Sequence, residues 1–305
     1  MTEPRRRLPK ILGIMAVALA LLPAATAHAA VSVSATSRSI PDYSGGVSTA
    51  FDVLVVGDQA ADDVQASGVY GDFHLALGVL VTDGAGAAAG TGCEQVDPTS
   101  VRCMVPTQQI GDATIAATLD GGPGNDTLHG GDVGNDLKGG PGDDLLDAGG
   151  LTVARLSGGA GADRLVGPSH VTQPRGGVVF DGGPGADVFE GFGAVSYASR
   201  TRPVHVDLRR HGAVQGAKGE HDTIERARIV YGGRAADTLI GGPHADVLDG
   251  GLGADLFARI AGGDIVRARD GRRDVIRCRG VPRRMNVDQR DAVRNCPPGR
   301  VFRPR

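Results

Sequence analysis

The sequence Gly121-Gly122-Pro123-Gly124-Asn125-Asp126-Thr127-Leu128-His129 is a nine-residue unit that recurs, with growing departures, as far as about Asp274. Glycine occupies its first, second and fourth places, and glycine adopts positive φ at little steric cost. The first half of each unit should therefore form a tight turn. The last three residues suffice for a strand with one inward side chain, the leucine. The unit predicts an all-β fold of short strands joined by tight turns.

Two such units make one coil of a flattened spiral, a parallel β-roll or β-solenoid, so turns 18 residues apart should stack on the same side. Neighbouring strands lie ~4.8 Å apart, and Ca²⁺ prefers oxygen ligands at ~2.3–2.6 Å. An ion therefore fits midway between two stacked turns, where an aspartate from each turn and carbonyl oxygens can hold it. The pattern predicts calcium as the bound metal.

The candidate ligands are the aspartates that follow the glycines of each unit: Asp126, Asp136, Asp144, Asp163, Asp187, Asp237, Asp246, Asp255 and Asp264, with an irregular last member at Asp274. Pairs at a spacing of 18 or 19 residues are expected to share ions: Asp126 with Asp144, Asp144 with Asp163, Asp237 with Asp255, and Asp246 with Asp264. Asp187 has no partner 18 residues away, so we expect it to matter less than Asp255.

Several units depart from the pattern. Asp136 comes one place late in the unit at residues 130–138, and Ala154 stands where the next aspartate is expected. A coil without an ion is expected at Ala154. Ala235 and His244 replace the fourth-place glycine in two later units, which predicts altered turns and weaker sites there.

The pattern G-G-x-G-x-D-x-U-x resembles the RTX, or haemolysin-type, calcium-binding repeat family. The resemblance covers residues 119–277, as a first array at 119–193 and a second at 232–277, and implies a calcium-binding β-roll in a secreted bacterial protein. The intervening segment 194–231 contains the run Val-Ser-Tyr-Ala-Ser-Arg-Thr-Arg-Pro-Val-His-Val-Asp-Leu. It resembles stretches interleaved with such repeats, which implies wider coils without metal.

Residues 1–29 have the features of a secretory signal peptide: arginines at 5–7, an apolar stretch at 11–22, and Ala27-His28-Ala29 for cleavage. The alternative is a membrane anchor, but the apolar stretch falls short of the ~20 residues that span a bilayer. We therefore expect secretion to the extracellular space and no membrane span in the mature chain.

The flanking regions lack the nine-residue unit. Residues 30–118 contain β-branched and alternating runs between Gly, Asp and Ser turns, which predicts an N-terminal β-rich cap domain. A cap is expected because an uncovered solenoid edge invites aggregation. Residues 278–305 are expected to form a disulfide-pinned cap followed by a disordered basic tail.

Four cysteines permit three pairings. Cys93 with Cys103 and Cys278 with Cys296 lie close in sequence at the two ends of the array, which favours two local disulfides in an oxidising compartment. The alternative, a Cys₄ metal site, lacks any C-x-x-C spacing.

Charge is distributed unevenly. Residues 256–305 contain fourteen arginines against five aspartates, in a chain whose formal net charge is −3. Such a basic end either contacts an anionic surface or polymer or forms a solvated face. We expect no nucleic-acid partner.

Familiar catalytic motifs are absent: the sequence has no G-x-S-x-G, no H-E-x-x-H and no Walker A loop. Three hypotheses follow. The first is a secreted, non-enzymatic calcium-binding β-solenoid whose folding is coupled to Ca²⁺. The second is an adhesin that recognises a cell surface or extracellular polymer through residues 30–118 or the basic tail. The third is a secreted hydrolase with an unrecognised site in residues 30–118.

Overall fold

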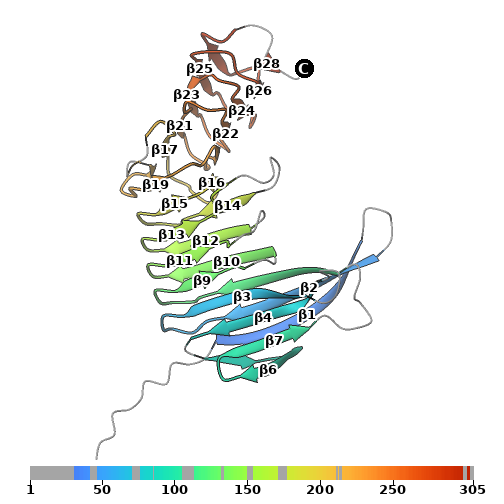
Figure 1. The fold of residues 1–305 in the computed structure, drawn as a ribbon. Coiled ribbons are helices and arrows are strands. Elements are labelled where there is room, and N and C mark those ends of the chain that lie inside the picture. Colours follow the sequence, from blue (N-terminus) through green and yellow to red (C-terminus); the bar gives the residue numbers. More distant parts are fainter. Residues whose placement is uncertain are drawn as a thin grey trace, which may run out of the picture.

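The computed structural model describes residues 31–41, 47–70, 76–84, 86–104, 113–131, 134–149, 154–170, 177–210, 212, 215–297 and 301–302. These residues form strands and turns and no helix. They build a column of stacked coils that rises from a broader N-terminal sheet (Figure 1). The predicted all-β, parallel β-roll is confirmed.

Sheet 1 extends along the whole column with 13 strands. From the C-terminal end its strands are β28 (Val301–Phe302), β26 (Arg284–Val287), β24 (Ile265–Ala268), β22 (Val247–Asp249), β20 (Ile229–Tyr231), β16 (Ala194–Ser196), β14 (Val178–Asp181), β12 (Ala154–Ala160), β10 (Gly134–Pro141), β8 (Ala113–Asp120), β2 (Val47–Val56), β1 (Val31–Pro41) and β5 (Ala87–Ala89). Neighbouring strands from β2 to β28 are parallel.

Two further sheets complete the coils. Sheet 2 contains β19 (Thr223–Ile224), β15 (Val188–Glu190), β13 (Arg164–Val166), β11 (Leu145–Asp147), β9 (Thr127–His129), β3 (Asp63–Tyr70), β4 (Ala76–Asp83), β7 (Ser100–Met104) and β6 (Cys93–Asp97). Sheet 3 contains β18 (Gly216–Ala217), β17 (Val204–Asp207), β21 (Thr238–Ile240), β23 (Leu256–Ile260), β25 (Val275–Cys278) and β27 (Ala292–Arg294). The chain alternates between sheet 1 and one of these two.

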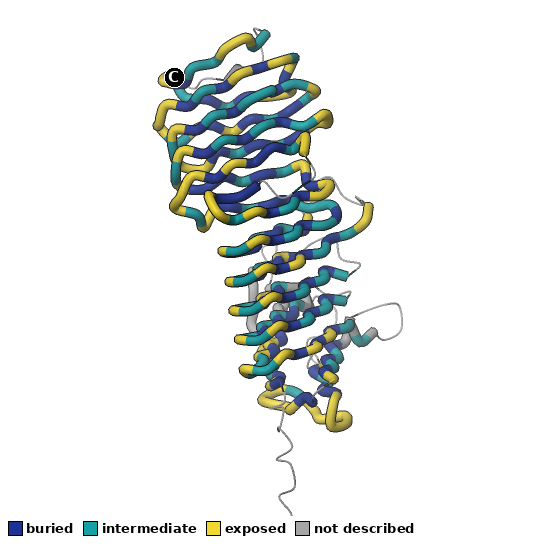
Figure 2. Tube along the Cα trace, turned by 90° about the vertical axis from the view of Figure 1, so that its left-hand side faces the viewer, coloured by how far each residue is buried: buried dark blue, intermediate teal, exposed yellow. Residues whose placement is uncertain are grey.

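The core is a set of columns, because each short strand directs one large side chain inward. Leu119, Leu137 and Leu156 stack in sheet 1, opposite the sheet 2 column that contains Leu128 and Leu146, and all five are fully buried. Figure 2 shows the resulting bands of buried residues alternating with exposed turns along the column. The leucine of the nine-residue unit therefore points inward as predicted.

The turns stack backbone against backbone. Gly142 has φ of 145°, and a Cβ built on it would lie 1.5 Å from the carbonyl oxygen of Gly124 in the coil below. A side chain at this place would strain the turn and separate the coils, which explains the repeated glycine.

The N-terminal strands continue both sheets beyond the first coil. Strand β2 pairs in parallel with β8, and β3 pairs in parallel with β9. The outer pairs β1–β2, β3–β4, β4–β7 and β6–β7 are antiparallel. Strand β8 already belongs to the parallel ladder, although most of it falls inside the segment 30–118 expected as a cap. A separate capping role for that segment stays a prediction.

Both predicted disulfides are present. Cys93 is bonded to Cys103 and Cys278 to Cys296, with Cα–Cα distances of 4.2 and 4.8 Å. The first joins the neighbouring strands β6 and β7. The expected signal segment at 1–29 lies outside the described residues. Within the part of the chain that is described, no helix has the length and apolarity of a membrane span.

One wide coil breaks the regular spiral between the two arrays. Its strands β16 and β20 continue sheet 1, but between them the chain makes a hairpin, β17–β18, and then strand β19. Strand β19 ends sheet 2, whereas the hairpin begins sheet 3 (Figure 1). The segment expected as an interleaved coil is thus the place where sheet 2 ends and sheet 3 begins.

Candidate metal centre

Aspartates at the ends of the turns form a hydrogen-bonded ladder along the first array. The Oδ1 atom of each accepts the backbone N–H of the aspartate one coil below. The N···Oδ1 distances are 2.8 Å from Asp126 to Asp144, 2.9 Å from Asp144 to Asp163, and 3.0 Å from Asp163 to Asp187. The first aspartate ladder consists of Asp62, Asp126, Asp144, Asp163, Asp187 and Asp222.

A second aspartate ladder lies along sheet 3 and consists of Asp237, Asp255, Asp274 and Asp291. Its first member accepts the N–H of Val204 at 2.9 Å. One further pair, Asp246 with Asp264, is joined in the same way at 2.9 Å at the turns that lead into sheet 1. The four pairs expected from their spacing are therefore neighbours in the structure.

Two candidate ligands differ from the others. Asp187 has ladder neighbours on both sides, Asp163 and Asp222, although these lie 24 and 35 residues away, and its expected lesser importance stays a prediction. Asp136 joins neither ladder, because it lies inside strand β10, next to the inward Leu137, but its Oδ1 atom is buried without a hydrogen-bond partner. Its role as a calcium ligand stays a prediction.

Sequence reasoning missed three ladder members, Asp62, Asp222 and Asp291. Each stands two residues before an inward or partly buried aliphatic side chain: Val64, Ile224 and Val293. The shorter pattern of an aspartate two places before an aliphatic residue, without the glycines, finds all of them.

The second carboxylate oxygen behaves differently in different turns. The Oδ2 atom is buried and has no hydrogen-bond partner in Asp126, Asp144, Asp163 and Asp187 of the first ladder and in Asp274 of the second. By contrast, Oδ2 of Asp237, Asp246 and Asp264 accepts a backbone N–H from its own turn, at 2.6, 2.7 and 2.8 Å.

The fourth-place residue accounts for the closed turns of Asp237 and Asp246. It does not account for Asp264, where the fourth place is Gly262 and the N–H comes from Ala261, or for Asp274, where Arg272 stands at that place and Oδ2 is still unpartnered. The second-place glycine has positive φ in turns that keep the fourth-place glycine, for example 117° at Gly140 and 77° at Gly251. In the turns with Ala235 and His244 at the fourth place, Gly233 and Gly242 are not among the positive-φ residues and their N–H groups reach Oδ2. The expected alteration of these two turns is therefore a closure of each turn onto its own aspartate.

Two of the unpartnered oxygens, Oδ2 of Asp144 and Oδ2 of Asp163, lie near a carbonyl oxygen from the coil above. A Cβ built on Gly139 would lie 2.1 Å from Asp144 Oδ2 and 2.6 Å from the carbonyl oxygen of Gly158. A buried carboxylate oxygen without a donor is costly unless a proton or a cation compensates it. Among the described residues no three His, Cys, Asp or Glu side chains gather as a metal site. A cation would thus need turn carbonyls as well, and Ca²⁺ accepts such ligands.

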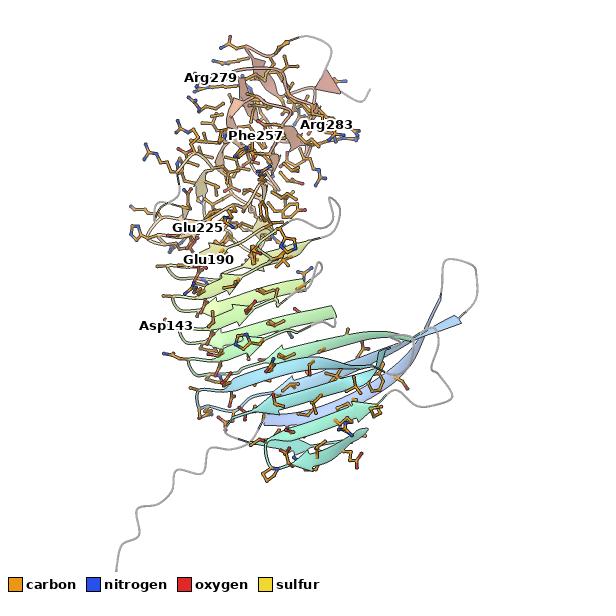
Figure 3. The ribbon with its side chains drawn as sticks, in the orientation of Figure 1. Asp143, Glu190, Glu225, Phe257, Arg279 and Arg283 are labelled. Atoms are coloured by element: carbon orange, nitrogen blue, oxygen red, sulfur yellow. A yellow bond between two sulfur atoms is a disulfide. The ribbon has the colours of Figure 1, made fainter. Side chains whose placement is uncertain are left out.

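Polar residues at the fifth place form a parallel row on the surface. The side chain of Asn125 accepts the N–H of Asp143 at 2.9 Å, and Asp143, labelled in Figure 3, accepts the N–H of Ala162 at 2.8 Å. These bonds hold the turns in register next to the buried ladder.

Burial raises the pKa of four ladder carboxyls despite their hydrogen bonds from backbone N–H groups, and neighbouring carboxylates add to the rise. The pKa is raised to about 6 for Asp126, about 7 for Asp163 and about 8 for Asp187. Asp255 in the second ladder is raised to about 7. Near neutral pH these groups therefore favour a bound proton or a cation.

The raised pKa values predict that the calcium-free protein is less stable in mild alkali. A carboxyl with a raised folded-state pKa contributes its stability below the unfolded-state value of ~4 and loses it as pH rises through the folded value. The melting temperature of calcium-free protein should fall from about pH 5 to about pH 8. Calorimetric scans across this range test it, and a melting temperature that rises over the same interval would contradict these shifts.

Comparison with known proteins agrees with the geometry. The family model described as the RTX calcium-binding nonapeptide repeat matches residues 155–167 and 229–257, in four copies. The first segment contains Asp163, and the second contains Asp237, Asp246 and Asp255. No curated protein matches the chain. The chain therefore carries calcium-binding nonapeptide repeats of the RTX family, stacked as a β-roll.

Proposed function

We propose that this chain is a secreted, non-enzymatic structural protein whose β-roll is completed by calcium bound between stacked turns. The observation that carries the proposal is the row of buried, unpartnered Oδ2 atoms in Asp126, Asp144, Asp163 and Asp187. Asp274 has the same unpartnered Oδ2, and Asp255 joins this group because its turn has the same glycine conformations at Gly251 and Gly253. Asp237, Asp246 and Asp264 instead close their own turns.

The protein prepares each site through the ladder itself. Oδ1 of Asp163 is fixed by the N–H of Asp144 at 2.9 Å, so Oδ2 is held toward the coil above. There a Cβ built on Gly158 would lie 2.2 Å from Asp163 Oδ2 and 2.6 Å from the Gly182 carbonyl oxygen. When bound, calcium supplies positive charge and coordination that joins oxygens of successive coils. The carboxylates would otherwise repel one another along the ladder.

Calcium sites of extracellular modules bind at ~10⁻⁴–10⁻³ M. Sites in this range stay empty inside a cell and fill outside it, so folding of the array would follow export. The two disulfides suit the same oxidising destination. The expected signal segment at residues 1–29 supports this route.

The structure predicts opposite outcomes for two isosteric variants. Asp163→Asn removes the charge at an unpartnered Oδ2, so it should lose a large part of the calcium-induced rise in melting temperature while keeping its stability in chelator. Asp246→Asn replaces an oxygen that accepts the Gly242 N–H at 2.7 Å, so it should lower stability similarly with and without calcium. Circular dichroism melts in chelator and in millimolar calcium measure both.

Glu94→Gln is the matched control, because this exposed carboxylate on β6 lies far from both ladders in the fold. It should leave the calcium response unchanged. Equal calcium responses for wild type and Asp163→Asn would contradict the assignment of the first ladder as a calcium site.

A second candidate function, adhesion to an anionic polymer, is supported by the arginines of the last coils. Ten of them are exposed between residues 256 and 297. Figure 3 shows Arg279 and Arg283 projecting from opposite sides of the column. Among the arginines described in this stretch, only Arg267 has an ion pair, with Asp249 at 3.5 Å. Guanidinium groups without acidic partners suit carboxylate, sulfate or phosphate groups on a polymer.

The adhesion hypothesis predicts salt-sensitive retention on a sulfated polysaccharide column. Arg277 and Arg294 occupy paired positions on β25 and β27, so replacing both with glutamate should release the protein at lower salt. Arg155→Glu on β12 is the exposed control outside the arginine-rich end. Identical elution of the double variant and the control would eliminate these two arginines as the binding surface.

A further inference from the structure

The wide coil between the two arrays, residues 194–231, is called the coil break here. At this coil the last aspartate of the first ladder has different hydrogen-bond partners from the aspartates in the coils below. Asp222 accepts the N–H of Asp187 through Oδ1 at 3.0 Å, like its predecessors. Its Oδ2, however, accepts a hydrogen bond from the Tyr197 hydroxyl at 2.9 Å. Tyr197 is 1% exposed and packs edge-on against Phe189 with ring centroids 6.5 Å apart. The last carboxylate of the ladder therefore has a side-chain donor at Oδ2, whereas Oδ2 of Asp126, Asp144, Asp163 and Asp187 has no donor.

Arg200 places a positive charge at the same break. Its Nε donates to Glu220 Oε1 at 3.1 Å, its Nη1 lies 3.8 Å from Asp181 Oδ1, and its Nη2 donates to the carbonyl oxygen of Gly183. The guanidinium carbon lies 5.9 Å from the centre of the Tyr197 ring. Because the side chain is only 11% exposed, this charge is held inside the stack of turns.

The Gly183 carbonyl is the next position in a series that runs up the first array. The carbonyl oxygen of Gly122 lies against Gly140, that of Gly140 against Gly159, and that of Gly159 against Gly183. Above Gly183 the series meets the Arg200 guanidinium instead of another glycine. The backbone oxygen of Arg200 then accepts the Arg234 N–H at 2.9 Å and continues the stack into the second array.

We propose that the coil break contains a cation site which the chain fills with its own guanidinium. The Gly183 carbonyl, Asp181 and Glu220 supply oxygens, and Arg200 takes the place that a metal ion would otherwise occupy. A guanidinium keeps its charge at every physiological pH and cannot dissociate from the chain. The wide coil therefore stays docked on the turn at residues 182–187 when calcium is absent, and offers a folded seed from which both arrays grow as calcium binds.

The test compares calcium responses of wild type and Arg200→Ala. In chelator, Arg200→Ala should melt at a lower temperature because the acidic oxygens lose their cation. Millimolar calcium should raise its melting temperature by more than it raises that of the wild type, by roughly 2–4 °C or more, because the ion can now enter the vacated site. If Arg200 only contributed to packing, Arg200→Ala would lower the melting temperature by the same amount in chelator and in calcium. Arg200→Lys, which keeps the charge, should retain the wild-type calcium increment.

Arg164→Ala is the control, because Arg164 pairs with Glu190 at 2.9 Å on an exposed face and should leave the calcium increment unchanged. Equal increments for Arg200→Ala and wild type, or an enlarged increment in Arg200→Lys, would overturn the inference. Failure of Arg200→Ala to fold even in calcium would also overturn it. The Arg200 site is argued by analogy with the proposed calcium sites of the ladder, and the experiment tests the two proposals separately. A wild type without any calcium response contradicts the proposed function, whereas a response confined to Arg200→Ala supports this site alone.

Discussion

The structure depends on the hydrogen bond from one aspartate's backbone N–H to the next aspartate's Oδ1, repeated from coil to coil. Each coil buries only about two large apolar side chains, worth ~1.5–3 kcal/mol apiece, while ordering its residues costs ~1–2 kcal/mol each in backbone entropy. The thin core cannot balance that loss. The turns must contribute, and the ladder bonds fix each carboxylate so that its remaining oxygen lies between successive turns.

The sequence predicts most of this architecture because the ladder depends on a local pattern. An aspartate two places before an inward aliphatic residue sets both the hydrogen bond and the start of the strand, as for Asp126 and Leu128. Spacing along the chain is a poorer guide, because residues inserted elsewhere in a coil leave the turn in place. Asp222 therefore reaches Asp187 across 35 residues. Asp136 matches the spacing loosely but enters a strand instead of a turn.

The chemistry of several turns depends on a residue that is not itself a candidate ligand. In the turns of Asp144 and Asp163 the fourth place is glycine, the second-place glycine has positive φ, and Oδ2 accepts no hydrogen bond. With Ala235 or His244 at that place, the turn closes on its own carboxylate. The repeat model matches turns of both kinds, at Asp163 and at Asp246. A match to the repeat model therefore does not separate turns with an open Oδ2 from self-closing ones, whereas the hydrogen bond at Oδ2 does.

The most direct test of this account is anomalous diffraction from crystals of the calcium-loaded protein. The account predicts peaks between stacked turns beside Oδ2 of Asp126, Asp144, Asp163 and Asp187, with further peaks at Asp255 and Asp274. It predicts no peak at the self-closing turns of Asp237 and Asp246, and none at the guanidinium of Arg200. Peaks distributed equally over both kinds of turn, or an empty first ladder in millimolar calcium, would contradict it.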